Sequence, residues 1–304
     1  MNGSALRERE KTMGNLALVV IDGQNDFCAN GNESDGIRGS LCVKGACTEA
    51  VSVANLIQKL GPDLASISAT LDSHQRNDCS IHKTWTDKQG NSPPPFTMVS
   101  QGDIEEERYL PRWESVPWVE KNISSKDWAL FYTKALQQHG RSPLCLWPVH
   151  CQIGTWGNNV YPVLHHAYDD WCQKTQKFIN YVVKGTFPYA EYYSAFGAAV
   201  HLPVCPEPRF NRHLYLHLRD HDRILWAGWA GSHCLRYSAL DAIRHSQECK
   251  DEDFARKCVF FEDACAAVAD IPGATCKFSD WRRTFLDEVA SLGATVTNTR
   301  DFKA

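Results

Sequence analysis

Four long runs of apolar and β-branched residues constrain most strongly what this chain can fold into. They are LALVVID (16–22), LASISATLDSH (64–74), RILWAGWAG (223–231) and KCVFFEDAC (257–265). Continuous apolar runs of this length are typical of strands that are buried on both faces of a parallel sheet. Two further strand candidates are YVVKGTF (181–187) and ATVTNT (294–299).

Helical patterns alternate with these runs. They are TEAVSVANLIQKL (48–60), CLRYSALDAIRHS (234–246) and WRRTFLDEVASLG (281–293), the last ending in a glycine that fits a helix cap. Alternating strands and helices predict βαβ units with right-handed crossovers. We therefore expect an α/β fold, with a mostly parallel sheet flanked by helices on both faces. Ligands of such sheets bind beyond the carboxyl ends of the strands.

The length of 304 residues and the net charge of −4 limit the organisation and the partners. Residues 1–14 are polar and lack the apolar core of a secretory signal, so we interpret them as a flexible leader. Residues 15–304 are predicted to form a single domain, with insertions near 86–145 and 199–222 that lie over the sheet. Nucleic acid and membrane are not expected as partners, because the charge is negative and no apolar run could span a bilayer.

The thirteen cysteines are an odd number without the spacing of a disulfide framework. A chain of this size has a core of its own and needs no disulfides for stability. We therefore predict a reducing, cytoplasmic location in which most of the thiols are free. At most one or two of the thiols should have a special chemical role.

Asp22 and Lys184 each follow or end an apolar run, where a charged side chain needs an explanation. Asp22 closes the first run in VVIDGQNDF, although an aspartate that merely caps a loop is also common at such a place. Lys184, in YVVKGTF, lies between apolar residues and a glycine. A partly buried ammonium needs an anionic partner, whereas a lysine at a strand end is as often solvated.

Cys234 stands where the apolar run of WAGWAGSHC meets a helical pattern. A thiol in the first turn of a helix faces unpaired N–H groups and the positive end of the helix dipole, and both favour thiolate. A nearby lysine would lower the pKa of the thiol further. The same N–H groups could hold an oxyanion. An inert buried cysteine is the alternative, because position alone does not distinguish one of thirteen.

Asp72 and His74 form an Asp-x-His pair at the end of the second long run. Alternate residues of an extended segment point to the same side, so the pair could be half of a site for Zn²⁺, Fe²⁺ or Mn²⁺. His150 is a third candidate ligand, and Asp78 and His82 are weaker fourth candidates. Each histidine taken alone is more often structural than a ligand.

Taken in order, these motifs resemble the nicotinamidase branch of the isochorismatase-like cysteine hydrolases. VVIDGQNDF, LDSH, WPVHCQIGTWG, YVVKGT…YSAF and GSHCLRYSALDAI carry the resemblance, which runs from about Asn15 to about Ala267 outside the insertions. The family fold is a Rossmann-like three-layer α/β structure, in agreement with the strand and helix pattern. The resemblance implies that Asp22, Lys184 and Cys234 are the catalytic residues.

The resemblance also implies roles around the catalytic residues. Asp72, His74 and His150 would hold one divalent transition metal (Zn, Fe or Mn). The aromatic rings of Phe27 and Trp147 would sandwich the substrate ring. Backbone N–H groups of Ala230 and Cys234 would form the oxyanion hole, with a non-proline cis peptide at Trp229–Ala230.

The expected function is a metal-dependent amidase that hydrolyses nicotinamide or a related small amide, in a chain that forms a homo-oligomer. This sequence departs from the family pattern by having Gly231 and Ser232 where many members have Thr-Asp, and by its insertions. A histidine that often follows Asp-x-His in small nicotinamidases falls near Asp78, with His82 out of register. A metal-independent isochorismatase-type or carbamoyl hydrolase, or a catalytically silent binding protein, are the alternatives.

Overall fold

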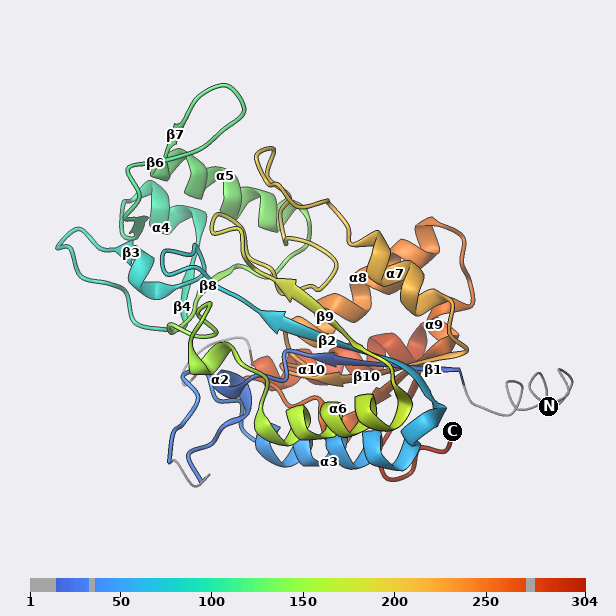
Figure 1. The fold of residues 1–304 in the computed structure, drawn as a ribbon. Helices are drawn as coiled ribbons and strands as arrows, with labels where there is room; N and C mark the ends of the chain where they lie inside the picture. The colour runs from blue at the N-terminus through green and yellow to red at the C-terminus, as the bar shows by residue number, and fades with distance from the viewer. Residues whose placement is uncertain (1–14, 33–35, 272–276) are drawn as a thin grey trace, which may run out of the picture.

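Six parallel strands form the main sheet of the protein (Figure 1). In the computed structural model, residues 15–32, 36–271 and 277–304 are described, so the predicted leader 1–14 lies outside the described residues. The sheet order is β12-β11-β10-β1-β2-β9. The strands are β1 (Leu16–Ile21), β2 (Leu64–Asp72), β9 (Ile179–Lys184), β10 (Arg223–Gly228), β11 (Cys258–Phe261) and β12 (Thr295–Thr297).

All six predicted strands are confirmed; five lie within their predicted runs, and β9 begins two residues before the predicted 181–187 and ends three residues before its end. Every residue of β1 is buried, because the strand lies inside the sheet between β10 and β2. β9 is an edge strand, and Tyr181 and Val183 are exposed on it. It ends at Lys184 because Gly185 takes the left-handed conformation, with φ +81°. β11 ends at Phe261, where a 3₁₀ turn (Glu262–Ala264) begins.

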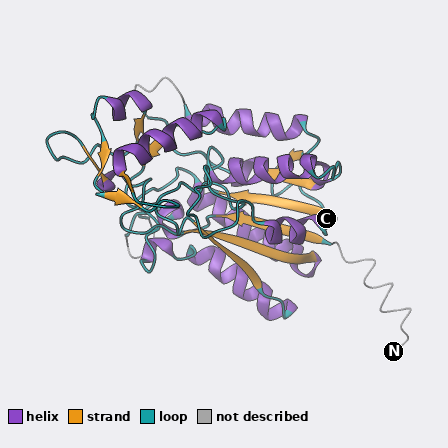
Figure 2. Cartoon of the chain, turned by 90° about the horizontal axis from the view of Figure 1, so that it is seen from above, coloured by secondary structure: helices purple, strands orange, loops and turns teal. Residues whose placement is uncertain are grey.

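Helices cover both faces of the sheet, which confirms the three-layer α/β architecture (Figures 1 and 2). α3 (Ala46–Leu60) and α6 (Pro162–Thr175) pack together on one face. α8 (Cys234–Glu248) and α10 (Phe278–Ser291) contact each other on the opposite face. From β1 the chain adds strands on one side, and from β10 it adds them on the other side, so right-handed crossovers place the later helices on the opposite face. The smaller helices on that side are α7 (Arg212–Arg219) and α9 (Phe254–Lys257). α6 has no counterpart among the predicted helices, although its buried residues Leu164, Ala167, Tyr168 and Trp171 have helical spacing.

The first insertion forms a small layer beyond the carboxyl ends of β2 and β9 (Figure 1). It contains α4 (Gln101–Glu105) and α5 (Ser125–Gln138). Three short antiparallel pairs complete it: β3 (Trp85–Thr86) with β5 (Leu110–Pro111), β4 (Thr97–Val99) with β8 (Leu144–Leu146), and β6 (Ser115–Val116) with β7 (Ile123–Ser124). Trp85, Trp128 and Tyr132 fill a second hydrophobic core, to which Ala199, Val200 and Leu202 of the second insertion also contribute. The two insertions therefore stabilise each other.

The described residues include twelve of the thirteen cysteines. None of these described cysteines is assigned to a disulfide. In the same part of the chain, none of the helices has the length and apolar character needed to cross a membrane.

Candidate active site

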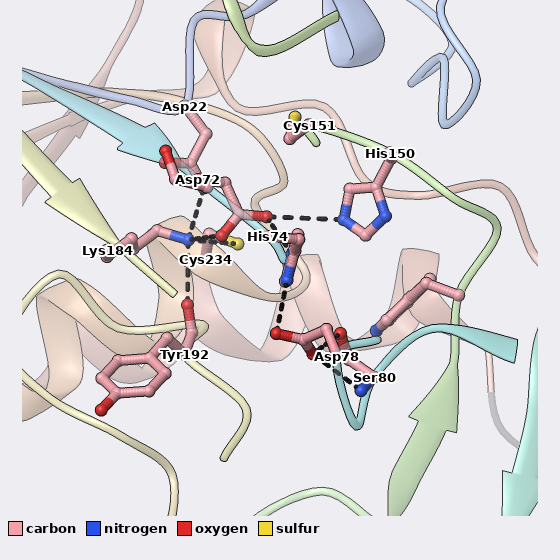
Figure 3. Close-up of polar contacts among 12 residues, drawn as sticks. Asp22, Asp72, His74, Asp78, Ser80, His150, Cys151, Lys184, Tyr192 and Cys234 are labelled. Carbon is pink, nitrogen blue, oxygen red and sulfur yellow. Dashed lines mark hydrogen bonds and ion pairs between the residues drawn. The ribbon is translucent and has the colours of Figure 1, made fainter. Parts of the chain in front are cut away.

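Polar side chains meet at the carboxyl ends of four neighbouring strands (Figure 3). Asp22 follows β1, Asp72 ends β2, and Lys184 ends β9. Cys234 follows β10 as the first residue of α8. Asp72 and Lys184 are direct partners in the β2–β9 register. The sheet order β10-β1-β2-β9 thus brings together residues that are far apart in the sequence.

Lys184 is the centre of this group (Figure 3). Its Nζ atom lies 2.9 Å from Oδ2 of Asp22 and 2.9 Å from Oδ1 of Asp72. It also donates to the carbonyl oxygen of Tyr192 at 2.9 Å and lies 3.6 Å from Sγ of Cys234. Burial disfavours the ammonium, but the two carboxylates outweigh it and hold the pKa of Lys184 well above its usual value. The lysine is therefore a buried cation.

Asp22 is completely buried and has a φ of +50°, a left-handed conformation that is rare for a residue other than glycine. Thr70 fixes it twice: the Asp22 N–H donates to Oγ1 of Thr70 at 2.8 Å, and that hydroxyl donates to Oδ1 at 2.5 Å. Burial raises the pKa of Asp22, and Lys184 opposes the rise. A carboxylate with a raised pKa is a better proton acceptor than one in water.

Cys234 is nearly buried, and burial raises the pKa of its thiol well above the usual value. Lys184 lowers this pKa, as expected from the sequence, but Asp22 and Asp72 raise it. The helix position and Lys184 favour the thiolate, but burial beside two carboxylates outweighs them, so the pKa of the thiol is raised. The neutral thiol needs a base, and the neighbouring carboxylate of Asp22 is the candidate.

Ala230 and Cys234 line the same cavity, and each carries a backbone N–H group that could serve as a donor there. A cis peptide joins Trp229 and Ala230, which confirms the expectation from the resemblance. Within residues 15–32, 36–271 and 277–304, no acceptor is found for the N–H groups of Ala230 and Cys234. Cys234 is in the first turn of α8, where N–H groups have no intrahelical partner. Such donors can hold a developing oxyanion.

Asp72, His74 and His150 form a buried group whose ligand atoms lie within 4.8 Å of one another. Oδ2 of Asp72 is 2.9 Å from Nε2 of His74 and 3.4 Å from Nε2 of His150. Nδ1 of His150 lies 2.8 Å from the carbonyl oxygen of Pro148, so this nitrogen carries the proton and Nε2 is the free ligand atom. Two imidazoles and a carboxylate that converge in this way suit a divalent transition metal.

The two weaker ligand candidates lie elsewhere. Oδ2 of Asp78 is 3.3 Å from Nδ1 of His74, on the far side of the ring from Asp72. Asp78 is itself held by the backbone N–H and hydroxyl of Ser80. It therefore orients His74, as carboxylates commonly do for ligating histidines. His82 faces the carbonyl oxygen of Pro93 instead, at 2.9 Å, and does not belong to the group.

A small, mostly apolar cavity lies against Cys234, Asp72 and His150. Phe27, in α2 (Asn25–Cys28), and Trp147 both line it, as the resemblance implies for rings that sandwich a substrate. Further lining residues that sequence analysis did not select are Leu41, Glu191, Tyr193, His233 and Val268. Glu191 and Tyr193 lie inside the motif around YSAF, but nothing in their spacing distinguished them.

Glu191 and His233 are the polar groups among these additional lining residues. Burial raises the pKa of Glu191 to about 7, and its Oε2 has no hydrogen-bond partner within the described part of the chain. Oε1 of Glu191 accepts from the N–H of Tyr192 at 2.9 Å. Burial lowers the pKa of His233 to about 3, so its ring is neutral. Nδ1 of His233 lies 2.8 Å from the hydroxyl of Ser232.

Comparison with known proteins finds similar sequences and folds. No protein-family model matches the chain. The nicotinamidase of Saccharomyces cerevisiae is 24% identical over 225 residues, which cover 74% of this chain and 80% of the yeast protein.

Solved structures agree over nearly the whole chain. The yeast nicotinamidase structure matches with a TM-score of 0.58 and 19% identity, covering 93% of this chain and 99% of the yeast chain. A nicotinamidase/pyrazinamidase of Acinetobacter baumanii gives a TM-score of 0.57 at 20% identity, over 95% and 99% of the two chains. A protein of L. infantum in complex with nicotinate gives 0.52 at 20% identity, over 94% and 93%. These structures share the fold.

Proposed function

We propose that this chain, a nicotinamidase-related member of the isochorismatase-like family, is a metal-dependent cysteine amidohydrolase. Its substrate would be nicotinamide or a related small amide, and its products the carboxylic acid and ammonia. The observation that carries the proposal is the position of the Lys184 ammonium, in contact with Asp22 and Asp72 and 3.6 Å from Sγ of Cys234. The yeast relative is a nicotinamidase, and the L. infantum protein was solved with nicotinate, which supports the same substrate class.

The first half-reaction forms a thioester. Asp22 takes the proton of Cys234, and the thiolate attacks the amide carbonyl carbon. Lys184 offsets the negative charge that now lies on sulfur. The carbonyl oxygen becomes an oxyanion that accepts from the N–H groups of Ala230 and Cys234. The C–N bond then breaks as Asp22 returns its proton to nitrogen, and ammonia leaves.

The second half-reaction hydrolyses the thioester. Asp22 is again ionised and takes a proton from a water molecule, whose oxygen attacks the acyl carbon. The same two N–H groups hold the second oxyanion. The C–S bond breaks, the sulfur regains the proton from Asp22, and the carboxylic acid is released. Asp22 thus serves as base and acid in turn, a role that its raised pKa supports.

Asp72, His74 and His150 would hold the metal, and their buried, convergent ligand atoms fit it. A bound divalent metal supplies Lewis acidity and orients a polar group of the substrate. Phe27 and Trp147 would flank an aromatic ring in the mostly apolar cavity. The presence of an intact donor set favours this proposal over the metal-independent alternative.

Ammonia release from a panel of amides tests the proposal. Metal-loaded protein is expected to hydrolyse nicotinamide or pyrazinamide faster than benzamide, which lacks a ring nitrogen. A chelator should remove the activity, and Zn²⁺, Fe²⁺ or Mn²⁺ should restore it. The Cys234→Ala variant, loaded in the same way, is the matched control. Metal-loaded protein that releases no ammonia from any small amide would refute the proposal.

A further inference from the structure

The segment Trp229–Gly231 contains Ala230, whose N–H is one of the two unpaired donors near Cys234. Residues that lie outside the active site hold this segment in place. Trp229 is completely buried, and its Nε1–H donates to Oε2 of Glu49 at 2.7 Å. Glu49 is in the first turn of α3, which packs on the opposite face of the sheet from α8. A side chain from one layer therefore reaches the residue that precedes a donor in the active site.

The same carboxylate oxygen also holds the other side of Ala230. Oε2 of Glu49 accepts from the N–H of Ala266 at 2.8 Å. The carbonyl oxygen of Ala266 in turn accepts from the N–H of Gly231 at 2.9 Å. Both neighbours of Ala230 are thus tied to one oxygen atom, Trp229 directly and Gly231 through the peptide of Ala266.

Close packing leaves this arrangement little room to shift. A Cβ atom at Gly231 would lie 2.1 Å from the carbonyl oxygen of Cys265, so backbone meets backbone there. Nε of Arg282 donates to the same carbonyl oxygen at 2.9 Å and places a cation near Glu49. Burial raises the pKa of Glu49, while its hydrogen bonds with Ala266 and Trp229 lower it.

We infer that Glu49 is a positioning residue for the oxyanion site, because its carboxylate holds Trp229 and the 265–266 peptide on either side of Ala230. The inference rests on the proposed function, in which the N–H of Ala230 stabilises an oxyanion. Oxyanion-hole donors act only within a few tenths of an ångström of their place, and one donor is worth roughly a hundred- to a thousandfold in kcat. Loosening the segment should therefore reduce kcat by roughly ten- to a hundredfold and change KM little.

Two reactions of Cys234 separate this role from general damage to the site. Acylation by p-nitrophenyl acetate passes through an oxyanion before p-nitrophenolate leaves. Alkylation by iodoacetamide displaces iodide from a saturated carbon and forms no oxyanion. Both rates are measured by mass spectrometry on the peptide that contains Cys234. Glu49→Leu removes the acceptor at similar volume, and Asn55→Leu, at an exposed position of α3, is the matched control.

In Glu49→Leu, we expect the ratio of acylation to alkylation to fall by at least roughly tenfold, and in Asn55→Leu to stay unchanged. Trp229→Phe, which removes the indole donor together with part of the ring volume, should lower the ratio in the same direction. The double variant should be no worse than Glu49→Leu. If Glu49→Leu does not fold, Trp229→Phe decides by the same ratio. An unchanged ratio in a folded variant, or an equal fall in both rates, would overturn the inference. Wild-type protein that hydrolyses no amide would refute the proposed function alone, because the ratio needs no amide turnover.

Discussion

Lys184 and Asp72 are paired residues of adjacent strands, and Nζ of Lys184 lies 2.9 Å from Oδ1 of Asp72. The other oxygen of Asp72, Oδ2, faces His74 and His150. One carboxylate therefore joins the lysine that supports Cys234 to the group that would hold the metal. A substitution at Lys184 should therefore affect the group that would hold the metal, and a substitution in that group should affect Lys184.

Lys184→Met should reduce activity by orders of magnitude and shift the pH profile of Cys234 alkylation to higher pH. Without the cation, the nascent thiolate faces Asp22 and Asp72 alone, so the pKa of the thiol rises further. The protein should also lose about 3–5 kcal/mol of unfolding free energy, because two buried carboxylates lose their partner. Urea unfolding measures this loss, with exposed Lys88→Met as the control. An unshifted alkylation profile in active Lys184→Met would remove the lysine from the mechanism.

Cys234→Ala should abolish turnover, by about 10⁴-fold or more, and leave the fold intact. The substitution removes one sulfur atom beside a cavity, so the thermal midpoint should change little. Ala replacement of Cys249, an exposed thiol on the far end of α8, is the control and should stay active. Turnover by the Cys234→Ala protein at the wild-type rate would contradict the proposed nucleophile.

Asp22→Asn should also stop turnover, for a different reason from Lys184→Met. The variant lacks the proton acceptor, but it keeps the lysine and loses a carboxylate that raises the pKa of Cys234. Its alkylation profile should therefore move to lower pH while amide hydrolysis is lost. A shift to higher pH would mean that Asp22 does not face the thiol as an anion.

His74→Ala should lose the metal, whereas Asp78→Asn should reduce the affinity for the metal by roughly ten- to a hundredfold. The first substitution removes a ligand, and the second removes only the carboxylate that orients His74 from 3.3 Å. Metal content after dialysis and a competition titration with a chelator measure the two effects. His82→Ala is the control and should bind as the wild type does. Full metal occupancy in His74→Ala would exclude the proposed ligand set.

The unfolding free energy of metal-free Glu191→Gln protein should increase relative to that of the wild type as the pH rises. Burial raises the pKa of Glu191 from 4.5 to about 7, so its stabilising contribution is present below about pH 4.5 and is lost as the pH rises through about 7. Glutamine does not titrate, so the difference in unfolding free energy should move in its favour by up to about 3 kcal/mol between about pH 4 and pH 8. Exposed Glu114→Gln should show no such trend. A pH-independent difference for Glu191→Gln would place the pKa of Glu191 outside this range.

The sequence by itself determined the sheet and the order of its chemistry. Strand runs such as 16–22 are local patterns, because a strand buried on both faces must be apolar along its length. Asp22, Asp72, Lys184 and Cys234 could be selected because parallel strands place their carboxyl ends at one edge. His150 was already a third candidate ligand from the sequence, and the family resemblance added the cis peptide at Trp229–Ala230, which the structure contains.

Only the tertiary structure decided properties that depend on contacts between distant segments. The direction of the Cys234 pKa shift follows from burial beside two carboxylates, which the position of a thiol in a helix does not reveal. Asp78 orients His74 rather than completing the ligand set, since the ring faces Asp72 on its other side. The hydrogen bond that Trp229 donates to Glu49 joins residues of two layers. Burial, charge and hydrogen bonding between such residues are set by three-dimensional packing, so no local pattern in the chain encodes them.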